Sequence, residues 1–381
     1  MDLEGYREEF PVLARKAYLI SASLGPVSRR SLAYLDEYVT AWTELGSPEP
    51  VWFERIFPRL REVKRSFARL TGAEPDELAI TTNVSLALST IASCLDFPPQ
   101  RNRVIISELD FPTEFHVWRA QERRGADVVV LPSPDGLTVP VEAYARAIDD
   151  RTAVACVNRV LYRSSALLDA TAICRLAAEA GAVSVVDDFH GAGIVPVDVR
   201  DLGCDFYTTG VLKWLCGGPG LAVVYARRDR IPSLAPLVTG WWGQADPFAF
   251  DTGFAYHPSA RRLETGTHPA PVAFIAQGGL DLILEVGPEA IRERQGDLTE
   301  SVIDRADAAG IPVRTPRDRK ARGGTVNLRV GPNAAEIEAA LYARDVCVDA
   351  RGDGIRVAPH FFNDERDLDR LFEALGALLQ R

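Results

Sequence analysis

The sequence predicts an α/β protein in which a seven-stranded, mostly parallel mixed sheet lies between layers of helices, with a smaller C-terminal α+β domain. Three observations predict this fold. Short runs rich in β-branched residues alternate with helical patterns, which is typical of a parallel sheet covered by helices. Several of these runs are apolar throughout, as in strands buried on both faces. After about Pro258 longer helical patterns replace the alternation.

The strand candidates follow one another between residues 78 and 225, and helical patterns separate most of them. The helical patterns are Ser85–Cys94, Thr113–Arg123 and Ala170–Ala180, the last with an apolar stripe along one side. The strand candidates are Leu78–Thr81, Arg103–Ser107, Asp127–Leu131, Ala153–Asn158, Val183–Asp187, Asp205–Thr208 and Leu221–Tyr225. Only a short glycine-rich stretch, Cys216–Gly220, precedes the last of them. A parallel crossover needs about a dozen residues, so we expect the last two strands to be antiparallel and the sheet to be mixed.

Three parts divide the predicted chain. Residues 1–17 form an N-terminal arm with a helix at Tyr6–Lys16 that packs outside the main core, residues 18–258 form the large domain, and residues 259–381 form the small domain. The small domain is expected to contain a long helix at Pro271–Gln295, a strand at Gly324–Val330 with a helix at Ala334–Ala343, and a β run at Val346–Val357 before a closing helix at Asp364–Gln380.

Composition limits the partners. The 381 residues are 47% hydrophobic and 25% charged, an ordinary globular mixture, with a net charge of −10. This charge disfavours nucleic acid or an anionic membrane as a partner, and no run approaches the roughly 18 apolar residues of a membrane span. The N-terminus has no signal core, and the six cysteines form no CxxC pair. We therefore expect a cytoplasmic protein with reduced cysteines and no metal site.

Polar residues that could take part in catalysis or ligand binding lie at the ends of two of the predicted strands or just beyond them. Asp187 ends a buried strand and Asp188 and His190 follow it, at the strand end where α/β sheets bind ligands. Lys213, one of only four lysines, lies between apolar residues just before Gly217. Apolar surroundings lower the pKa of a lysine and make its amine a nucleophile. Structural roles remain open: either aspartate can cap the next segment, and the lysine can lie along a sheet edge.

Together these residues predict a pyridoxal 5′-phosphate (PLP) site. A lysine amine holds the cofactor aldehyde, and a carboxylate keeps the pyridine nitrogen protonated so that the ring draws electrons. The segment Thr81–Ser85, between a strand and a helix, offers hydroxyl and N–H groups for the phosphate. Taken alone, this segment is better explained as a plain helix N-cap.

Six motifs in the same order resemble fold-type I, class V PLP enzymes, closest to the group of kynureninases, cysteine C–S lyases and isopenicillin N epimerase-like proteins. The resemblance covers nearly the whole chain. The motifs are Tyr18–Pro26, Phe111–Glu114, Leu161–Ser165, Asp187–His190, Gly240–Gly243 and Gly354–Pro359.

The resemblance implies a role for each matched residue. Lys213 would hold PLP covalently, Asp187 would pair with the pyridinium, Phe111 would stack on the ring and His190 would lie near it. Arg356 would bind the substrate α-carboxylate in the two-pronged manner of a guanidinium. The remaining candidates are Thr82, Asn83, Ser85, Tyr162 and Trp241 around the phosphate and ring, Thr267 at the phosphate across a homodimer interface, and Ser23 and Glu114 near the substrate.

Four departures from the kynureninase pattern put kynurenine itself in doubt. The residue before the lysine is Leu212 instead of Tyr or His, an Asn is replaced by Ala22, and Glu114 stands for a shorter Asp. The stretch Arg262–Pro269 resembles the R-x-x-x-G-T of cysteine desulfurases and epimerase-like proteins, and it lacks the Asn that contacts kynurenine. A persulfide-forming desulfurase is nevertheless disfavoured, because no cysteine lies between Arg351 and Arg356.

The resemblance thus predicts a PLP-dependent lyase that cleaves the Cβ–Cγ or Cβ–S bond of an amino acid in specialised metabolism. Two alternatives stay open. One is an aminotransferase or epimerase built on the same core. The other is a catalytically silent PLP-fold scaffold, for which Leu212 is the best argument and the intact Lys213, Asp187 and Arg356 the best counter-argument.

Overall fold

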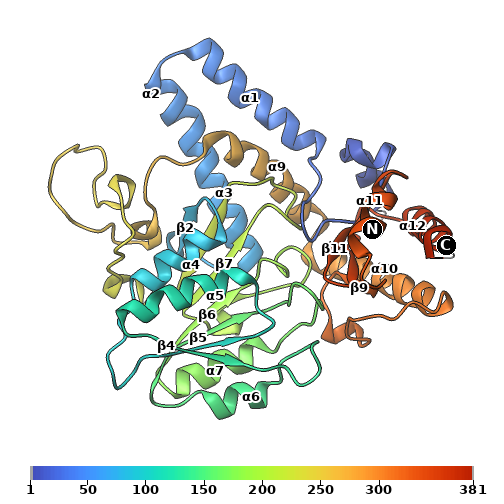
Figure 1. Ribbon diagram of the computed structural model, residues 1–381. Coiled ribbons are helices and arrows are strands. Elements are labelled where there is room, and N and C mark those ends of the chain that lie inside the picture. The colour runs from blue at the N-terminus through green and yellow to red at the C-terminus, as the bar shows by residue number, and fades with distance from the viewer. Residues whose placement is uncertain (1–2, 380–381) are drawn as a thin grey trace.

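A seven-stranded sheet forms the centre of the computed structural model, which describes residues 3–379 (Figure 1). The strand order is β2-β8-β7-β6-β5-β3-β4, and β8 runs antiparallel to both of its neighbours while the other pairs are parallel. The predicted mixed α/β sheet with an antiparallel last pair is therefore confirmed. The strands are β2 (Leu78–Thr81), β3 (Arg103–Ser107), β4 (Asp127–Leu131), β5 (Thr152–Asn158), β6 (Val183–Asp187), β7 (Phe206–Gly210) and β8 (Ala222–Ala226).

Both faces of this sheet are buried, as the apolar strand sequences predict. Along β3, Ile105 packs into one hydrophobic core, whereas Val104 and Ile106 pack into another on the opposite face. This alternation follows from the two-residue period of a strand. Three helices pack on the strands, namely α4 (Val84–Ser93), α5 (Pro112–Ala120) and α7 (Ala170–Glu179). Helices α6 (Val141–Ala147) and α8 (Val199–Leu202) pack against α7.

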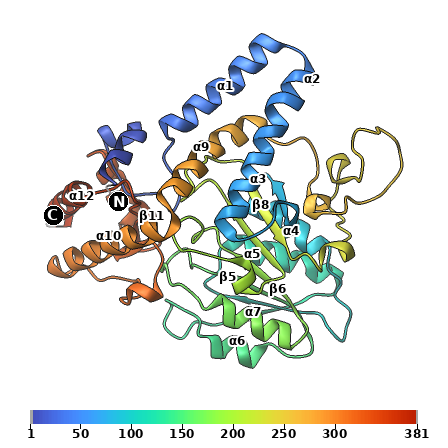
Figure 2. The same ribbon diagram turned by 180° about the vertical axis from the view of Figure 1, so that it is seen from behind.

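A group of helices, of which only α9 falls in a predicted helical stretch, covers the β2 side of the molecule (Figures 1 and 2). Helix α1 begins after Ser28, whose side chain accepts a hydrogen bond from the Ser31 N–H. Both α1 and α3 pack against α9, and Gly278 of α9 permits the close approach, because a Cβ there would lie 2.5 Å from the Ser31 nitrogen. The bounds are α1 (Arg29–Leu45), α2 (Pro48–Val51), a π-helical turn (Trp52–Ile56), α3 (Phe57–Thr71) and α9 (Ala270–Val286).

The predicted single helix at Pro271–Gln295 is wrong, because two helices share this stretch. Helix α9 ends at Val286, and α10 (Pro288–Ala308) begins at an angle of 83° to it. Gly287 between them has φ +86°, and Pro288 lacks an N–H to continue α9 but suits the first turn of α10. Among residues 3–379 no single helix is long and apolar enough to cross a membrane, although this bent pair passes the same test by length and composition.

The C-terminal part has its own three-stranded antiparallel sheet, β11-β12-β9, on one side of the large sheet (Figure 1). The predicted β run at Val346–Val357 is divided into three short strands, and the predicted closing helix reaches the last described residue, while Gln380 lies outside the described residues. The bounds are β9 (Val326–Arg329), α11 (Ala334–Tyr342), β10 (Val346–Cys347), β11 (Asp349–Arg351), β12 (Gly354–Val357) and α12 (Glu365–Leu379). The predicted division at residues 258 and 259 stays a prediction.

The N-terminal segment contacts both the C-terminal part and the Lys213 loop. The predicted helix at Tyr6–Lys16 is wrong: two 3₁₀ turns, Glu4–Glu9 and Pro11–Ala14, stand there, since Pro11 starts a new turn. Phe10 between them is 1% exposed and packs 4.3 Å from Phe362, ring centroid to ring centroid. Because Phe10 and Leu13 belong to the main hydrophobic core, the expectation that this segment packs outside that core is also wrong.

The chain then forms β1 (Ala17–Tyr18), which pairs with β10, and the Gly25 N–H donates to the Leu212 carbonyl at 2.8 Å. A Cβ on Gly25 would lie 2.0 Å from the Lys213 carbonyl oxygen. This contact brings the N-terminal segment and the Lys213 loop together.

Candidate functional site

The adjacent acids at the end of β6 have different surroundings. Asp188 is fully buried and accepts hydrogen bonds from Arg159 Nη1 and the Tyr207 hydroxyl, each at 2.9 Å. The Asp188 carboxylate is thus already bound by side chains of the protein. Asp187 accepts one from the Phe189 N–H at 2.8 Å, and its charge acts directly on Lys213. Of the two, Asp187 is the carboxylate available to a ligand, although it also caps the turn that follows.

Lys213 is 7% exposed and lies among aromatic rings. Its Nζ is 2.5 Å from His190 Nε2 and 4.1 Å from the ring centroid of Phe189. The ring centroid of Phe111, a predicted stacking residue that is 41% exposed, lies 5.6 Å from the same nitrogen. The structure therefore brings Lys213, Asp187, His190 and Phe111 together as the sequence predicts.

Burial changes the charge of this cluster. Burial lowers the pKa of Lys213 to about 7, and the attraction of the Asp187 carboxylate only partly opposes this. Burial and the nearby Lys213 charge lower the pKa of His190 well below its usual value, so the imidazole is neutral. A substantial fraction of Lys213 is therefore a free amine at neutral pH, as a nucleophile requires.

Glu114, predicted near the substrate, is fully buried beside Asp187. Asn158 Nδ2 donates to its Oε1 at 3.0 Å. Burial and the Asp187 charge raise the pKa of Glu114 well above its usual range, so the carboxyl keeps its proton and donates a hydrogen bond to Asp187. The geometry therefore places Glu114 behind Asp187, as support for that carboxylate.

The phosphate candidates lie at the start of α4, where helix N–H groups favour an anion. Thr82, Asn83 and Ser85 are all exposed. Asn83 Oδ1 accepts a hydrogen bond from the Leu86 N–H at 2.8 Å, which is the plain N-cap. Ser85 Oγ lies 3.0 Å from Thr113 Oγ1 of α5, so two hydroxyls from different helices meet at this helix start.

Arg356 is 2% exposed and is held on several sides. Its Nη1 donates to the Tyr162 carbonyl at 2.6 Å and its Nη2 donates to Ser23 Oγ at 2.7 Å. The Tyr162 ring packs edge-on against Phe111 at 5.2 Å. Arg356 also pairs with Asp349, Nε to Oδ1 at 2.8 Å. The predicted substrate residues Arg356 and Ser23 thus meet beside the predicted cofactor residue Tyr162.

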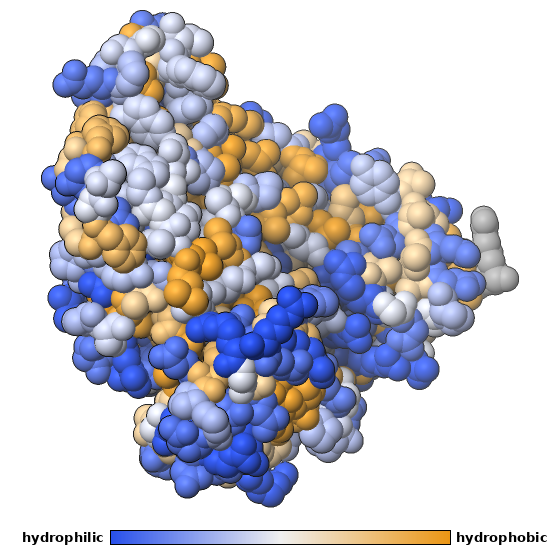
Figure 3. Space-filling model, turned by 60° about the vertical axis from the view of Figure 1, so that its left-hand side comes forward, coloured by the Kyte–Doolittle hydropathy of each residue, from blue (hydrophilic) through white to orange (hydrophobic). Residues whose placement is uncertain are grey.

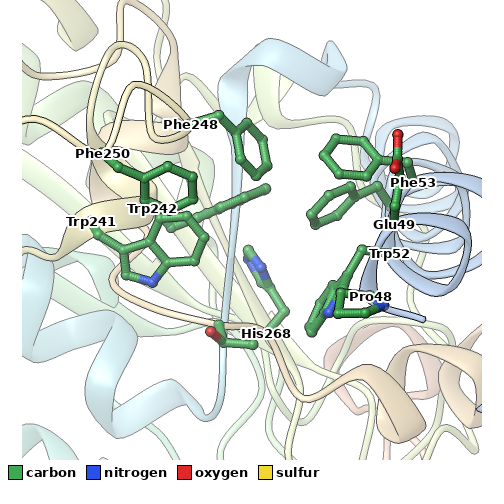
Figure 4. A pocket seen from close by; sticks show the side chains of 11 residues that line it. Pro48, Glu49, Trp52, Phe53, Trp241, Trp242, Phe248, Phe250 and His268 are labelled. Carbon is green, nitrogen blue, oxygen red and sulfur yellow. The ribbon is translucent and has the colours of Figure 1, made fainter. Parts of the chain in front are cut away.

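Trp241 and Thr267 line a different cavity of about 480 Å³, whose lining includes none of the residues around Lys213 (Figure 4). Figure 4 shows Trp241, Phe248 and Phe250 on one side, Trp52 and Phe53 on the other, and His268 between them. One chain therefore does not bring Trp241 and Thr267 to Lys213, and their predicted phosphate contacts would need a second copy. The lining residues are Pro48, Glu49, Trp52, Phe53, Phe57, Trp241, Trp242, Phe248, Phe250, Thr267 and His268.

The sequence reasoning missed Phe189, Asn158 and Asp349. Phe189 lies in the predicted Asp187–His190 motif, and Asn158 ends a predicted strand next to β6, so strand-end position was the available signal. Asp349 gave none, because its pairing with Arg356 depends on the turn between β11 and β12. Among residues 3–379 no group of His, Cys, Asp or Glu side chains could hold a metal ion.

The residues present fit PLP. A buried amine with a lowered pKa suits an aldehyde, and a carboxylate at the strand end suits a pyridine nitrogen. The part-exposed Phe111 ring offers an aromatic face, and the start of α4 offers hydroxyl and N–H donors.

Comparisons with known proteins show which family and which solved structures this chain resembles. Residues 17–367 match the family model "Aminotransferase class-V". The chain is 32% identical to the uncharacterized aminotransferase YcbU of Bacillus subtilis (98% of this chain, 97% of that protein) and 31% identical to a kynureninase of Burkholderia mallei (91% and 84%). A solved structure of mutant C-DES, with glycine covalently linked to its PLP cofactor, matches with a TM-score of 0.89 at 20% identity (97% and 98%).

Proposed function

Because it matches the family model over most of its length, the chain belongs to the class V aminotransferases, which are PLP-dependent enzymes, and we propose that it is a lyase that cleaves the Cβ–Cγ or Cβ–S bond of an amino acid. The observation that carries the proposal is the buried Lys213 amine, which lies near enough to Asp187 and to Arg356 for both charges to act on its pKa. When bound, PLP supplies an aldehyde that joins to an amine and a protonated pyridine ring that draws electrons from the substrate Cα.

The side chains of the protein would hold the reactants and move the protons. Lys213 Nζ, with its pKa of about 7, accepts the proton from the substrate Cα. His190 Nε2, 2.5 Å away, is placed to exchange a proton with it. Asp187, supported by Glu114, would pair with the ring nitrogen of the bound cofactor, and Arg356 with Ser23 would orient the substrate carboxylate.

The cysteines favour a lyase over a persulfide-forming desulfurase. Cys347, the cysteine nearest in sequence to Arg356, is 7% exposed, and burial raises its pKa. A cysteine nucleophile needs a thiolate, and Cys347 has neither the exposure nor the lowered pKa for it. The leaving fragment would then depart as a free acid or thiol. Hydrolysis at Cβ–Cγ consumes water and gives alanine and an acid, whereas elimination at Cβ–S, followed by water, gives pyruvate, ammonia and a thiol.

Single-turnover product analysis by mass spectrometry tests this proposal against its alternatives. The panel contains kynurenine, cysteine conjugates and plain amino acids. Alanine or pyruvate with a released fragment supports the lyase. Stoichiometric pyridoxamine phosphate identifies an aminotransferase, and recovered amino acid with inverted Cα identifies an epimerase. A visible cofactor band that disappears in Lys213→Ala would exclude the scaffold alternative. The absence of such a band would support it.

We further propose a homodimer in which each copy completes the site of the other. Large apolar side chains are exposed on the α1–α2 hairpin and on the loop from 237 to 254: Trp42 is 63% exposed, Leu237 71%, Phe250 81% and Phe254 66%. Figure 3 shows one face of the molecule with apolar residues in patches among polar ones. Such patches are typical of interfaces.

Mixing two variants tests the shared site. Lys213→Ala and Thr267→Ala chains each lack a different part of it. A mixed dimer contains one site with Lys213 from one copy and Thr267 from the other, so mixing should raise activity above the sum of the separate variants. Purely additive activity, or a monomer by light scattering, would contradict the shared site.

A further inference from the structure

The guanidinium of Arg356 has almost no free donor. Arginine has five N–H groups. Nε and Nη2 donate to Asp349 Oδ1 and Oδ2 at 2.8 and 2.5 Å, Nη2 also donates to Ser23, and Nη1 donates to the Tyr162 carbonyl. One N–H of Nη1 is left. A substrate carboxylate therefore finds the two-pronged edge already occupied by another carboxylate.

The strand register fixes this arrangement. Asp349 of β11 lies directly opposite Arg356 of β12 in the antiparallel pair, where side chains on one face are neighbours. Asp349 is 5% exposed. Ser23 Oγ donates to its Oδ2. Because both charges are buried, each one stabilises the other.

Arg351, at the other end of β11, offers Asp349 a second partner. Its Nη2 lies 3.0 Å from Asp349 Oδ2, and its side chain is 43% exposed. Two guanidinium groups and one carboxylate leave the cluster with one net positive charge. That charge matches a ligand with a single carboxylate.

We propose that Asp349 occupies the edge of Arg356 to which the substrate carboxylate binds, and that it is therefore a specificity-determining residue. It pairs with Arg356 before a substrate binds, and it yields the Nε and Nη2 edge to the entering carboxylate while it stays paired with Arg351. Because Asp349 must be displaced, the affinity of Arg356 for the substrate carboxylate is lower than it would be without Asp349. This inference rests on the proposed function, in which Arg356 binds the substrate carboxylate.

Binding of propionate to the holoenzyme, measured by calorimetry, tests the proposal, with propionamide as the neutral probe. In Asp349→Asn the competing charge is gone and Arg356 lacks a counter-ion, so propionate should bind about ten- to a hundredfold more tightly than to the unchanged protein, with propionamide unaffected. Asp353→Asn is the matched control, because Asp353 pairs with Arg314 and Arg329 near the surface of the same sheet, and it should bind propionate normally. Equal or weaker binding by Asp349→Asn would overturn the proposal.

A second measurement covers poor folding of Asp349→Asn. Propionate should raise its melting temperature more than that of the unchanged protein, because the ligand replaces the missing counter-ion. A smaller rise, or failure to fold even with propionate, would contradict the proposal.

Arg356→Gln separates this proposal from the proposed function. If Arg356→Gln binds propionate as the unchanged protein does, Arg356 does not bind the carboxylate. The role of Arg356 in the proposed function and the role of Asp349 are then both wrong. If Arg356→Gln loses binding while Asp349→Asn gains none, only the role of Asp349 is wrong.

Discussion

Lys213 and Arg356 are both buried cationic side chains of one site, but their surroundings differ. Among residues 3–379 no carboxylate lies within ion-pair distance of Lys213 Nζ, whereas Arg356 forms a two-pronged pair with Asp349. Burial without a close counter-ion lowers the pKa of Lys213 to about 7, whereas the buried guanidinium of Arg356 is balanced by the Asp349 carboxylate. In our proposal, the end of the large sheet supplies the amine nucleophile, and the small sheet supplies a guanidinium that can exchange Asp349 for the substrate carboxylate.

The largest expected effect is the loss of the amine. Lys213→Ala should lower kcat/KM by about 10⁴-fold or more and abolish the visible cofactor band, because the covalent link and the proton acceptor disappear together. Lys320→Ala, at an exposed lysine, is the control and should keep both. Substantial activity in Lys213→Ala would show that Lys213 is not the essential amine and would contradict the comparison with Arg356.

Removal of the second cation should have a smaller effect, mainly on substrate binding. Arg356→Gln should lower kcat/KM by about a hundredfold, chiefly through KM, since a charged hydrogen-bonded pair is lost. Arg329→Gln, on the same small sheet but paired with Asp353 at the surface, should differ little from the unchanged protein. A KM left unchanged by Arg356→Gln would remove Arg356 from carboxylate binding.

The proton on Lys213 should make cofactor capture depend on pH. The pKa of Lys213 is lowered to about 7, so the fraction of free amine falls about tenfold for each pH unit below that value. The rate at which the apoprotein takes up PLP should therefore rise with pH up to about 7 and then level off. A rate that keeps rising toward pH 10 would indicate an ordinary, exposed lysine.

Substitution of Glu114 tests whether the Asp187 carboxylate needs a neighbouring hydrogen-bond donor. Glu114→Gln retains an N–H donor and should keep activity within about threefold, whereas Glu114→Ala should lose about tenfold, because a hydrogen bond to a charged group is removed. The pH profile of the cofactor band should shift only in Glu114→Ala. Equal losses in both variants would show that Glu114 acts as an ionised carboxylate.

The smallest expected effect is at Cys347. Cys347→Ala should change kcat by less than about twofold, because the thiol is buried and its pKa is raised. Loss of activity together with loss of persulfide formation would replace the lyase by a desulfurase.

Strand ends were predictable from the sequence because buried strands have a distinctive composition. Asp187 and Lys213 could be placed in this way, since the apolar runs of β6 and β7 lead to one edge of the sheet. The Asp349–Arg356 pair could not, because the sequence does not show where the run from 346 to 357 turns back on itself. The burial of Glu114 behind Asp187 likewise depends on how α5 packs on the sheet. Trp241 and Thr267 remain predictions that need a second copy of the chain.

Trapping of the cofactor tests the central claim most directly. The holoenzyme is reduced with borohydride, which makes a lysine-bound cofactor permanent, and its peptides are identified by mass spectrometry. The account predicts a single pyridoxyl-phosphate adduct on Lys213. An adduct on Lys16, Lys64 or Lys320 instead, or no adduct at all, would contradict it.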